Sequence, residues 1–151
     1  MKIHHVCINV SDMDESLKLY RDFLGFHCYK DTVIPDGKNF DQQTLDDIFH
    51  VKGAKSRMAI LVCKETGTML ELEQAIVPKI QKVPREQLQY GYVGFSEVAF
   101  EITGIETWLE KVKAAGYETQ TDYVWSSAKL VKSFLFYDPD GNMVQMIEKL
   151  R

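Results

Sequence analysis

Ile3-His4-His5-Val6-Cys7-Ile8-Asn9-Val10 is the stretch that decides the fold, because a second stretch with the same strand-like pattern follows at residues 95–102, Phe95-Ser96-Glu97-Val98-Ala99-Phe100-Glu101-Ile102. Both stretches alternate like strands. Each is followed by a helix-like segment and then by a glycine with an aromatic neighbour, Gly25-Phe26 and Gly116-Tyr117. Each half later closes with another alternating strand, at residues 69–73 and 142–147. An internal duplication is a stronger fold signal than any single motif.

The expected elements follow the same order in both halves. In the first half we expect strands at 2–10, 26–33, 57–63 and 68–74, with one helix from the Ser11-Asp12 cap to about Leu24. In the second half we expect strands at 95–102, 117–124, 130–137 and 142–148, with one helix at 105–115. Each half is therefore βαβββ.

One helix covers only one face of a four-stranded sheet, so the other face must be buried against a partner. The sequence thus predicts an α+β fold in which two paired βαβββ modules form an open, barrel-like cleft. We expect a single domain over 1–151, with module one at about 1–75, a linker at about 76–92 and module two at about 93–151.

Bulk properties narrow the class of protein. Apolar residues make up 45% of the 151 residues and charged ones 26%, which is typical of a folded soluble protein. A formal charge of −4 argues against a nucleic-acid partner, and the apolar runs are too short to cross a membrane. Because a strand is expected from residue 2 onward, we expect no signal peptide. Three cysteines without metal-knuckle spacing indicate reduced thiols and a cytoplasmic location.

Residues 38–56 are an insertion relative to the second half, with a short helix expected near residues 41–49. Two interpretations remain open. The insertion either forms a lid or wall over the mouth of the cleft, or it packs against the outside of the sheet. As a wall it would add apolar surface through four side chains: Phe40, Leu45, Ile48 and Phe49.

The segments HHVCINVSDMDESLKLYRDFLGF and FLFYDPDGNMVQMIEKL, with the duplicated βαβββ pattern, resemble the vicinal oxygen chelate superfamily. This superfamily contains glyoxalases, bleomycin-resistance proteins and extradiol dioxygenases. In its metal-dependent members, the first and last strand of each module supply one ligand each. Carried over to this chain, the resemblance implies four metal ligands: His5, Glu71, Glu97 and Gln145. Strand alternation independently turns each of them away from the apolar, helix-covered side.

One imidazole and three oxygen donors suit an octahedral divalent ion with two open positions, so the expected cofactor is Zn, Ni, Co, Mn, Fe or Mg. Two positions depart from the family pattern. Glu97 stands where His is common, and Gln145 stands where a Glu usually acts as ligand and proton shuttle. An amide cannot move a proton. Dioxygenases use two histidines and one carboxylate, so oxygen chemistry is disfavoured.

The leading hypothesis is a metal-dependent, glyoxalase-like lyase, isomerase or epimerase that acts on a small molecule chelated through two oxygens. A bound ion would polarise the carbonyl, and Glu71 or Glu97 would remove the proton alpha to it. The alternative is a non-catalytic small-molecule binder of the bleomycin-resistance kind. Glu73 and Glu101 share the strand faces of these residues and could equally be solvated rim charges. The resemblance also implies a homodimer.

Overall fold

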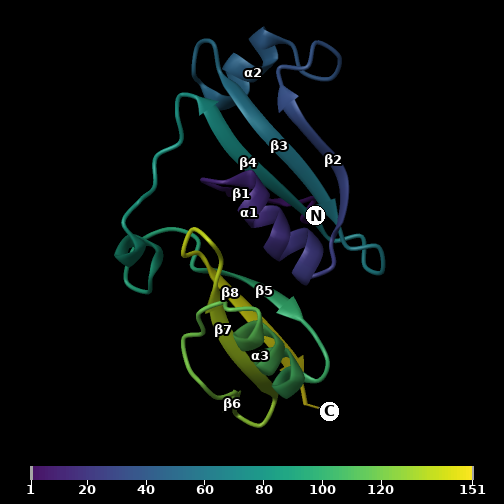
Figure 1. The fold of residues 1–151 in the computed structure, drawn as a ribbon, viewed down its shortest axis with the longest axis vertical. Helices are drawn as coiled ribbons and strands as arrows, with labels where there is room; N and C mark the ends of the chain where they lie inside the picture. The colour runs from purple at the N-terminus through teal and green to yellow at the C-terminus, as the bar shows by residue number, and fades with distance from the viewer. Residues whose placement is uncertain (1, 151) are drawn as a thin grey trace. The chain divides into compact units, whose positions relative to one another are not determined.

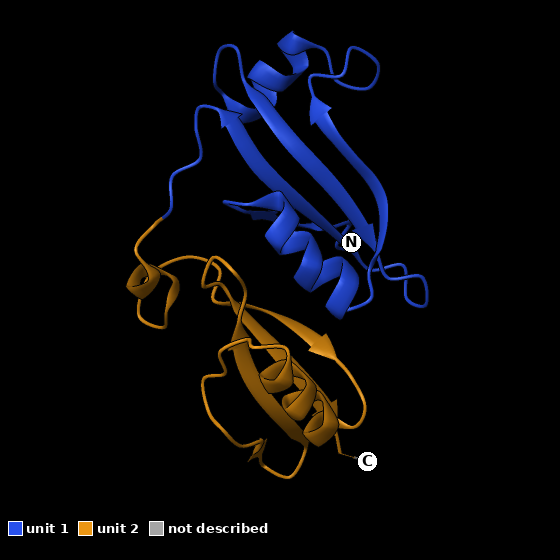
Figure 2. Ribbon diagram, in the orientation of Figure 1, with its two compact units in different colours: residues 1–82 blue, residues 83–151 orange. Residues whose placement is uncertain are grey.

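The computed structural model describes residues 2–150 and separates the chain into two compact units, residues 1–82 and residues 83–151 (Figure 2). Each unit contains one four-stranded mixed sheet and one long helical segment. The chain is therefore α+β, and the expected fold class is confirmed. Within residues 2–150 no helix has the length and apolar character needed to span a membrane.

Unit 1 carries a helix on one face of a sheet with the strand order β1-β4-β3-β2 (Figure 1). β1 is parallel to β4, and the other two pairs are antiparallel. The elements are β1 (Val6–Asn9), α1 (Met13–Leu17), β2 (His27–Ile34), α2 (Gln42–Phe49), β3 (Lys55–Val62) and β4 (Met69–Val77). π-helical turns over Lys18–Phe23 continue α1, so the helical segment ends near Leu24, as expected.

Unit 2 repeats this plan with the strand order β5-β8-β7-β6. β5 is parallel to β8, as β1 is to β4. The elements are β5 (Glu97–Glu101), α3 (Ile105–Ala114), β6 (Trp125–Ser127), β7 (Val131–Tyr137) and β8 (Met143–Lys149), preceded by a 3₁₀ turn at Arg85–Leu88. The helical segments of both units end alike, because Gly25 and Gly116 adopt φ values of 83° and 84°, where a side chain would be strained.

A side chain from the last strand of each unit caps that unit's helix. In unit 1, Gln74 accepts a hydrogen bond from the Met13 amide at 3.0 Å and donates one to the Ser11 carbonyl at 3.1 Å. In unit 2, the Glu148 carboxylate accepts hydrogen bonds from the amides of Gly104 and Ile105, at 2.7 and 3.3 Å. The first amides of a helix have no partner within it, so both residues stabilise the joint between helix and sheet.

The Gln74→Ala substitution is expected to lower the free energy of unfolding by about 1 kcal/mol, because it removes a helix cap and leaves the Ser11 carbonyl without that donor. Urea denaturation followed by circular dichroism measures the change. Gln120→Ala, at an exposed position in unit 2, is the matched control and should be neutral. Equal stability of the two variants would contradict the capping role.

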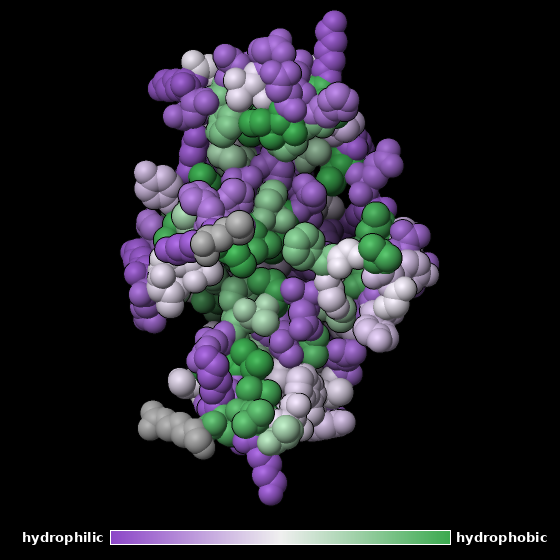
Figure 3. All heavy atoms as spheres, turned by 180° about the vertical axis from the view of Figure 1, so that it is seen from behind, coloured by the Kyte–Doolittle hydropathy of each residue, from purple (hydrophilic) through white to green (hydrophobic). Residues whose placement is uncertain are grey.

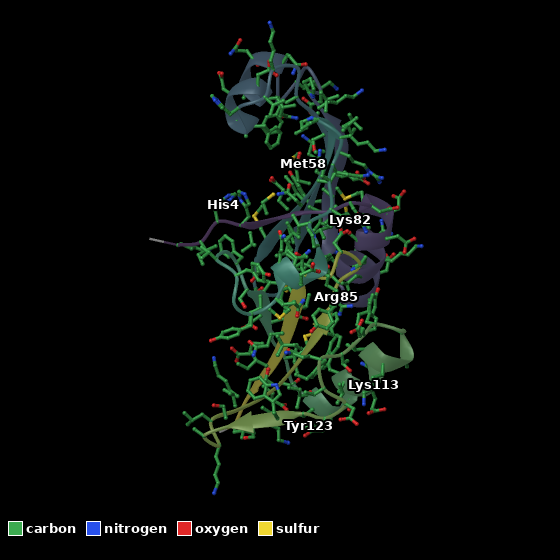
Figure 4. The ribbon with its side chains drawn as sticks, turned by 90° about the vertical axis from the view of Figure 1, so that its left-hand side faces the viewer. His4, Met58, Lys82, Arg85, Lys113 and Tyr123 are labelled. Atoms are coloured by element: carbon green, nitrogen blue, oxygen red, sulfur yellow. The ribbon has the colours of Figure 1, made fainter. Side chains whose placement is uncertain are left out.

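The insertion packs on the face of the first sheet opposite α1. Arg57 forms an ion pair with Asp14 of α1, and Gln74, which pairs with Arg57 across the strands, caps α1. Adjacent residues of a strand face opposite sides of the sheet, so the residues next to Arg57 and Gln74 face away from α1. One of those neighbours, Met58, belongs to an apolar cluster built around α2. The buried members of this cluster are Ile34, Leu45, Ala54 and Met58. Figure 4 shows α1 and α2 on opposite sides of the strands. The insertion therefore walls the face that carries Met58 and does not cover the α1 side.

Two strand predictions need correction. The first strand begins at Val6, not residue 2, because its pairing with β4 starts at Val6 opposite Leu70. The strand expected at 117–124 is wrong: only an isolated bridge, Thr119 to Phe136, forms there, and the regular strand is β6. In this segment side chains bond the backbone in place of a ladder, since Lys113 and Thr121 donate to the carbonyls of Asp122 and Tyr123.

Candidate functional site

The strand register gives the predicted ligands equivalent positions in the two units. Glu71 pairs with Cys7 across β1 and β4, and Gln145 pairs with Ala99 across β5 and β8. His5 lies two residues before Cys7, and Glu97 lies two residues before Ala99. Each unit thus contributes one residue from its first strand region and one from its last strand to the predicted set.

The predicted residues of the last strands lie on the sheet faces opposite α1 and α3. In β4, Gln74 points to α1, so Glu71 and Glu73 point to the opposite face. In β8, Glu148 caps α3, so Gln145 and Ile147 point away from α3. The alternation predicted from the sequence is therefore present in both units.

His5 is exposed and lies just before β1, next in the chain to His4, which Figure 4 labels. The Nδ1 atoms of the two rings are 2.8 Å apart, and the ring planes are nearly perpendicular, at 82°. When Nδ1 of His5 donates this hydrogen bond to His4, Nε2 of His5 keeps its lone pair and can bind a metal. A second residue that fixes the imidazole in this way is typical of metal-binding histidines.

Glu71 is half-buried on β4, next to the thiol of Cys7. Cys7 is exposed at the surface, but partial burial of its thiol, together with the negative charges of Glu71 and Glu73, raises the pKa of Cys7 to about 12. This thiol therefore stays protonated at neutral pH and is available as a donor to a carboxylate. A half-buried carboxylate and an oriented imidazole suit a divalent ion, so the donor chemistry of unit 1 fits the metal that the resemblance implies.

Glu73 is the feature of this face that sequence reasoning missed, because a rim charge seemed equally plausible there. Its side chain is 3% exposed, and neither carboxylate oxygen has a hydrogen-bond partner among the described residues. Burial raises the pKa of Glu73 to about 7; the charge of Glu71 adds to the rise and the nearby Ser56 hydroxyl opposes it. That hydroxyl nonetheless donates its hydrogen to the Gln74 carbonyl, at 2.9 Å.

The corresponding residues of unit 2 differ in exposure and charge. Glu97 is exposed, and Gln145 is buried at 9% exposure. Glu101 is a solvated rim charge, exposed and paired with Lys149 at 2.7 Å. Carboxylates therefore occupy two neighbouring β4 positions of unit 1, whereas an amide and an isoleucine occupy the matching β8 positions of unit 2.

The Asp138-Pro139-Asp140-Gly141 turn serves the hairpin between β7 and β8. One Asp138 oxygen accepts hydrogen bonds from the amides of Asp140 and Asn142, at 2.9 and 2.8 Å. An adjacent surface hollow of about 320 Å³ is lined by Arg85, which stacks 4.2 Å above the Tyr137 ring and pairs with Glu118 at 2.8 Å. The positive charge of Arg85 is therefore already neutralised by Glu118 within unit 2.

Among residues 2–150 no three His, Cys, Asp or Glu side chains are gathered in a way that could hold a metal ion. The predicted ligands are divided two and two between the units, with His5 and Glu71 in unit 1 and Glu97 and Gln145 in unit 2. The four-residue set stays a prediction, supported by the equivalent strand positions and by the donor chemistry of His5 and Glu71.

A family model matches residues 2–146, nearly the whole chain. The chain belongs to the Glyoxalase/Bleomycin resistance protein/Dioxygenase superfamily. The expected family is thereby confirmed. No curated protein matches this glyoxalase-superfamily chain in sequence.

Solved structures of the same superfamily share the fold at low identity. A glyoxalase family protein from Bacillus cereus is 13% identical with a TM-score of 0.84, covering 100% of this chain and 95% of its own. One from Enterococcus faecalis is 22% identical with a TM-score of 0.69, covering 97% of both chains. The fosfomycin resistance protein FosX of Listeria monocytogenes, solved with Mn(II) and sulfate, is 14% identical with a TM-score of 0.62, covering 97% and 91%.

Proposed function

We propose that this glyoxalase-superfamily chain is a metal-dependent lyase, isomerase or epimerase that moves a proton alpha to a carbonyl of a small molecule. The observation that carries the proposal is the position of Glu71. It is a half-buried carboxylate on the face of β4 opposite α1, at the place that matches Gln145 in β8. A manganese-containing relative of the same fold supports a metal cofactor in general.

His5, Glu71, Glu97 and Gln145 would hold the divalent ion. When bound, such an ion polarises a substrate carbonyl and makes the adjacent proton more acidic. Glu71 or Glu97 would accept that proton and return it, since the Gln145 amide has no basic site. A homodimer and a cytoplasmic location are part of the proposal, in keeping with the resemblance and with three cysteines that form no disulfide.

The second candidate is a small-molecule binder of the bleomycin-resistance kind. It is favoured by the two departures in unit 2, where Glu97 replaces a common histidine and the buried Gln145 replaces a common glutamate. The apolar cluster around α2 would suit a bound hydrophobic group equally well under both proposals. Metal content and proton exchange distinguish the two.

We expect the purified chain, loaded with Mn(II) or Ni(II) and desalted, to retain one ion per chain by elemental analysis. His5→Ala and Glu71→Ala should each lower the retained metal at least tenfold, because each removes one of four ligands. His27→Ala and Glu65→Ala, at exposed positions, are the matched controls and should retain the ion. Wild-type protein that holds no metal after loading would refute the enzyme and favour the binder.

A screen for the reaction follows on the metal-loaded protein. Dicarbonyl hemithioacetals and acyl-thioester epimers are incubated in deuterated water, and exchange at the alpha carbon is recorded by NMR. Exchange that requires the loaded metal supports proton transfer. Tight binding without exchange across the panel would count against it.

A further inference from the structure

The buried carboxylate of Glu73 has no role in the structure of unit 1 that accounts for it. Its strand neighbours are Asn9 on β1 and Met58 on β3, and among the described residues none donates a hydrogen bond to it. The Ser56 hydroxyl, which lies close enough to influence Glu73, donates its hydrogen to the Gln74 carbonyl. A buried polar group left without a partner costs several kcal/mol, so such groups usually have a bound partner or a function.

The second unit shows that this position does not require a charge. Glu71 corresponds to Gln145 by strand register, so Glu73 corresponds to Ile147, which is half-buried in β8. An apolar side chain therefore fits the equivalent place in the same βαβββ arrangement. The carboxylate at position 73 is a feature of unit 1 alone, beside the predicted ligand Glu71.

The surroundings of Glu73 combine a polar and an apolar side. Glu71 lies two residues away on the same face of β4. On the other side Met58 joins the buried cluster around α2, and half-buried Ile60 packs against that cluster. Figure 3, which looks from behind onto the side opposite α1, shows hydrophobic surface at the α2 end of unit 1. Met58 has a flexible, unbranched side chain, of the kind that adapts its packing to a bound ligand.

We propose that Glu73 is a substrate-contacting residue whose carboxylate accepts a hydrogen bond from a hydroxyl group of the ligand, while an apolar part of the ligand packs against Met58 and Ile60. This inference rests on the proposed function, in which the face of unit 1 opposite α1 binds the substrate. The ligand class is a 2-hydroxy acid or 2-hydroxy carbonyl compound with an apolar substituent. Its hydroxyl hydrogen supplies the donor that the protein does not provide to Glu73.

Mandelate and phenylglyoxylate are suitable probes, because both carry a carboxylate, a neighbouring oxygen and a phenyl ring, but only the mandelate oxygen bears a hydrogen. Calorimetry is done with both the Mn(II)-loaded and the metal-free wild-type protein. Mandelate should bind about tenfold to a hundredfold more tightly than phenylglyoxylate, as expected for a hydrogen bond to a charged acceptor. Glu73→Ile, which copies the residue of unit 2, should remove this preference and leave phenylglyoxylate binding within about threefold. Glu101→Gln is the control and should keep the preference.

Three outcomes would overturn the inference: an unchanged mandelate preference in Glu73→Ile, no preference in the wild type, or no binding of either probe by the wild type. Metal retention is measured in parallel on each variant, which separates this inference from the proposed function. Glu73→Ile that keeps its Mn(II) but loses the preference supports the contact. Wild type that retains no metal yet shows a Glu73-dependent preference would refute the enzyme and leave the contact standing.

Discussion

Whichever of Glu71 and Glu97 is the base, its substitution by Gln is expected to lower turnover about 10²–10⁴-fold, the usual contribution of a positioned general base, once an exchanging substrate has been found. The substitution keeps the shape of the side chain and removes its ability to accept a proton. The measurement is alpha-proton exchange on the metal-loaded protein, with circular dichroism to check that the fold is intact.

The two substitutions also distinguish the base from a residue that only binds the ion. A variant that retains the metal but loses exchange identifies the base, whereas one that loses both identifies a ligand. Glu101→Gln is the matched control, because Glu101 is an exposed carboxylate paired with Lys149 at the other end of β5. An unaffected rate in both Glu71→Gln and Glu97→Gln would remove these carboxylates from the mechanism.

The duplicated plan of the chain was predictable because local patterns carry it. The Leu70-Glu71-Leu72 alternation predicts which side chains of β4 face the helix, and the strand pairing agrees. The turn glycines predict where both helical segments end, since only their φ values permit that turn without strain. The boundaries of paired strands were less predictable. They depend on where the partner strand begins, as the late start of β1 at Val6 shows.

The position of α2 and the burial of Glu73 could not be read from the sequence, for one physical reason. An amphipathic helix reveals that it has an apolar face, but not which side of a sheet that face will cover. The packing of Leu45 against Ile34 and Met58 decides the matter in three dimensions. Likewise, an exposed glutamate and a buried one look identical in the sequence: Glu73 is buried and Glu101 is exposed, although both lie on the same strand face as a predicted ligand.

Glu73→Ile is expected to increase the free energy of unfolding at pH 8 by about 3 kcal/mol. Burial raises the pKa of Glu73 from 4.5 to about 7, so the folded state binds its proton more tightly than the unfolded state does. Stability from this group is complete below pH 4.5 and is lost as the pH rises through about 7. The loss amounts to about 1.4 kcal/mol for each pH unit of that window.

Urea denaturation of the chelator-treated protein at several pH values tests this expectation. The wild type should lose stability between pH 4.5 and about pH 7 relative to Glu73→Ile, in which the buried charge is absent. The two proteins should therefore differ most at pH 8 and least at pH 4.5. Glu65→Gln, at an exposed turn position, is the control and should follow the wild-type curve. Parallel curves for the wild type and Glu73→Ile would mean that the Glu73 carboxylate is solvated or paired in solution. The cost of burying it would then no longer support a role in ligand binding.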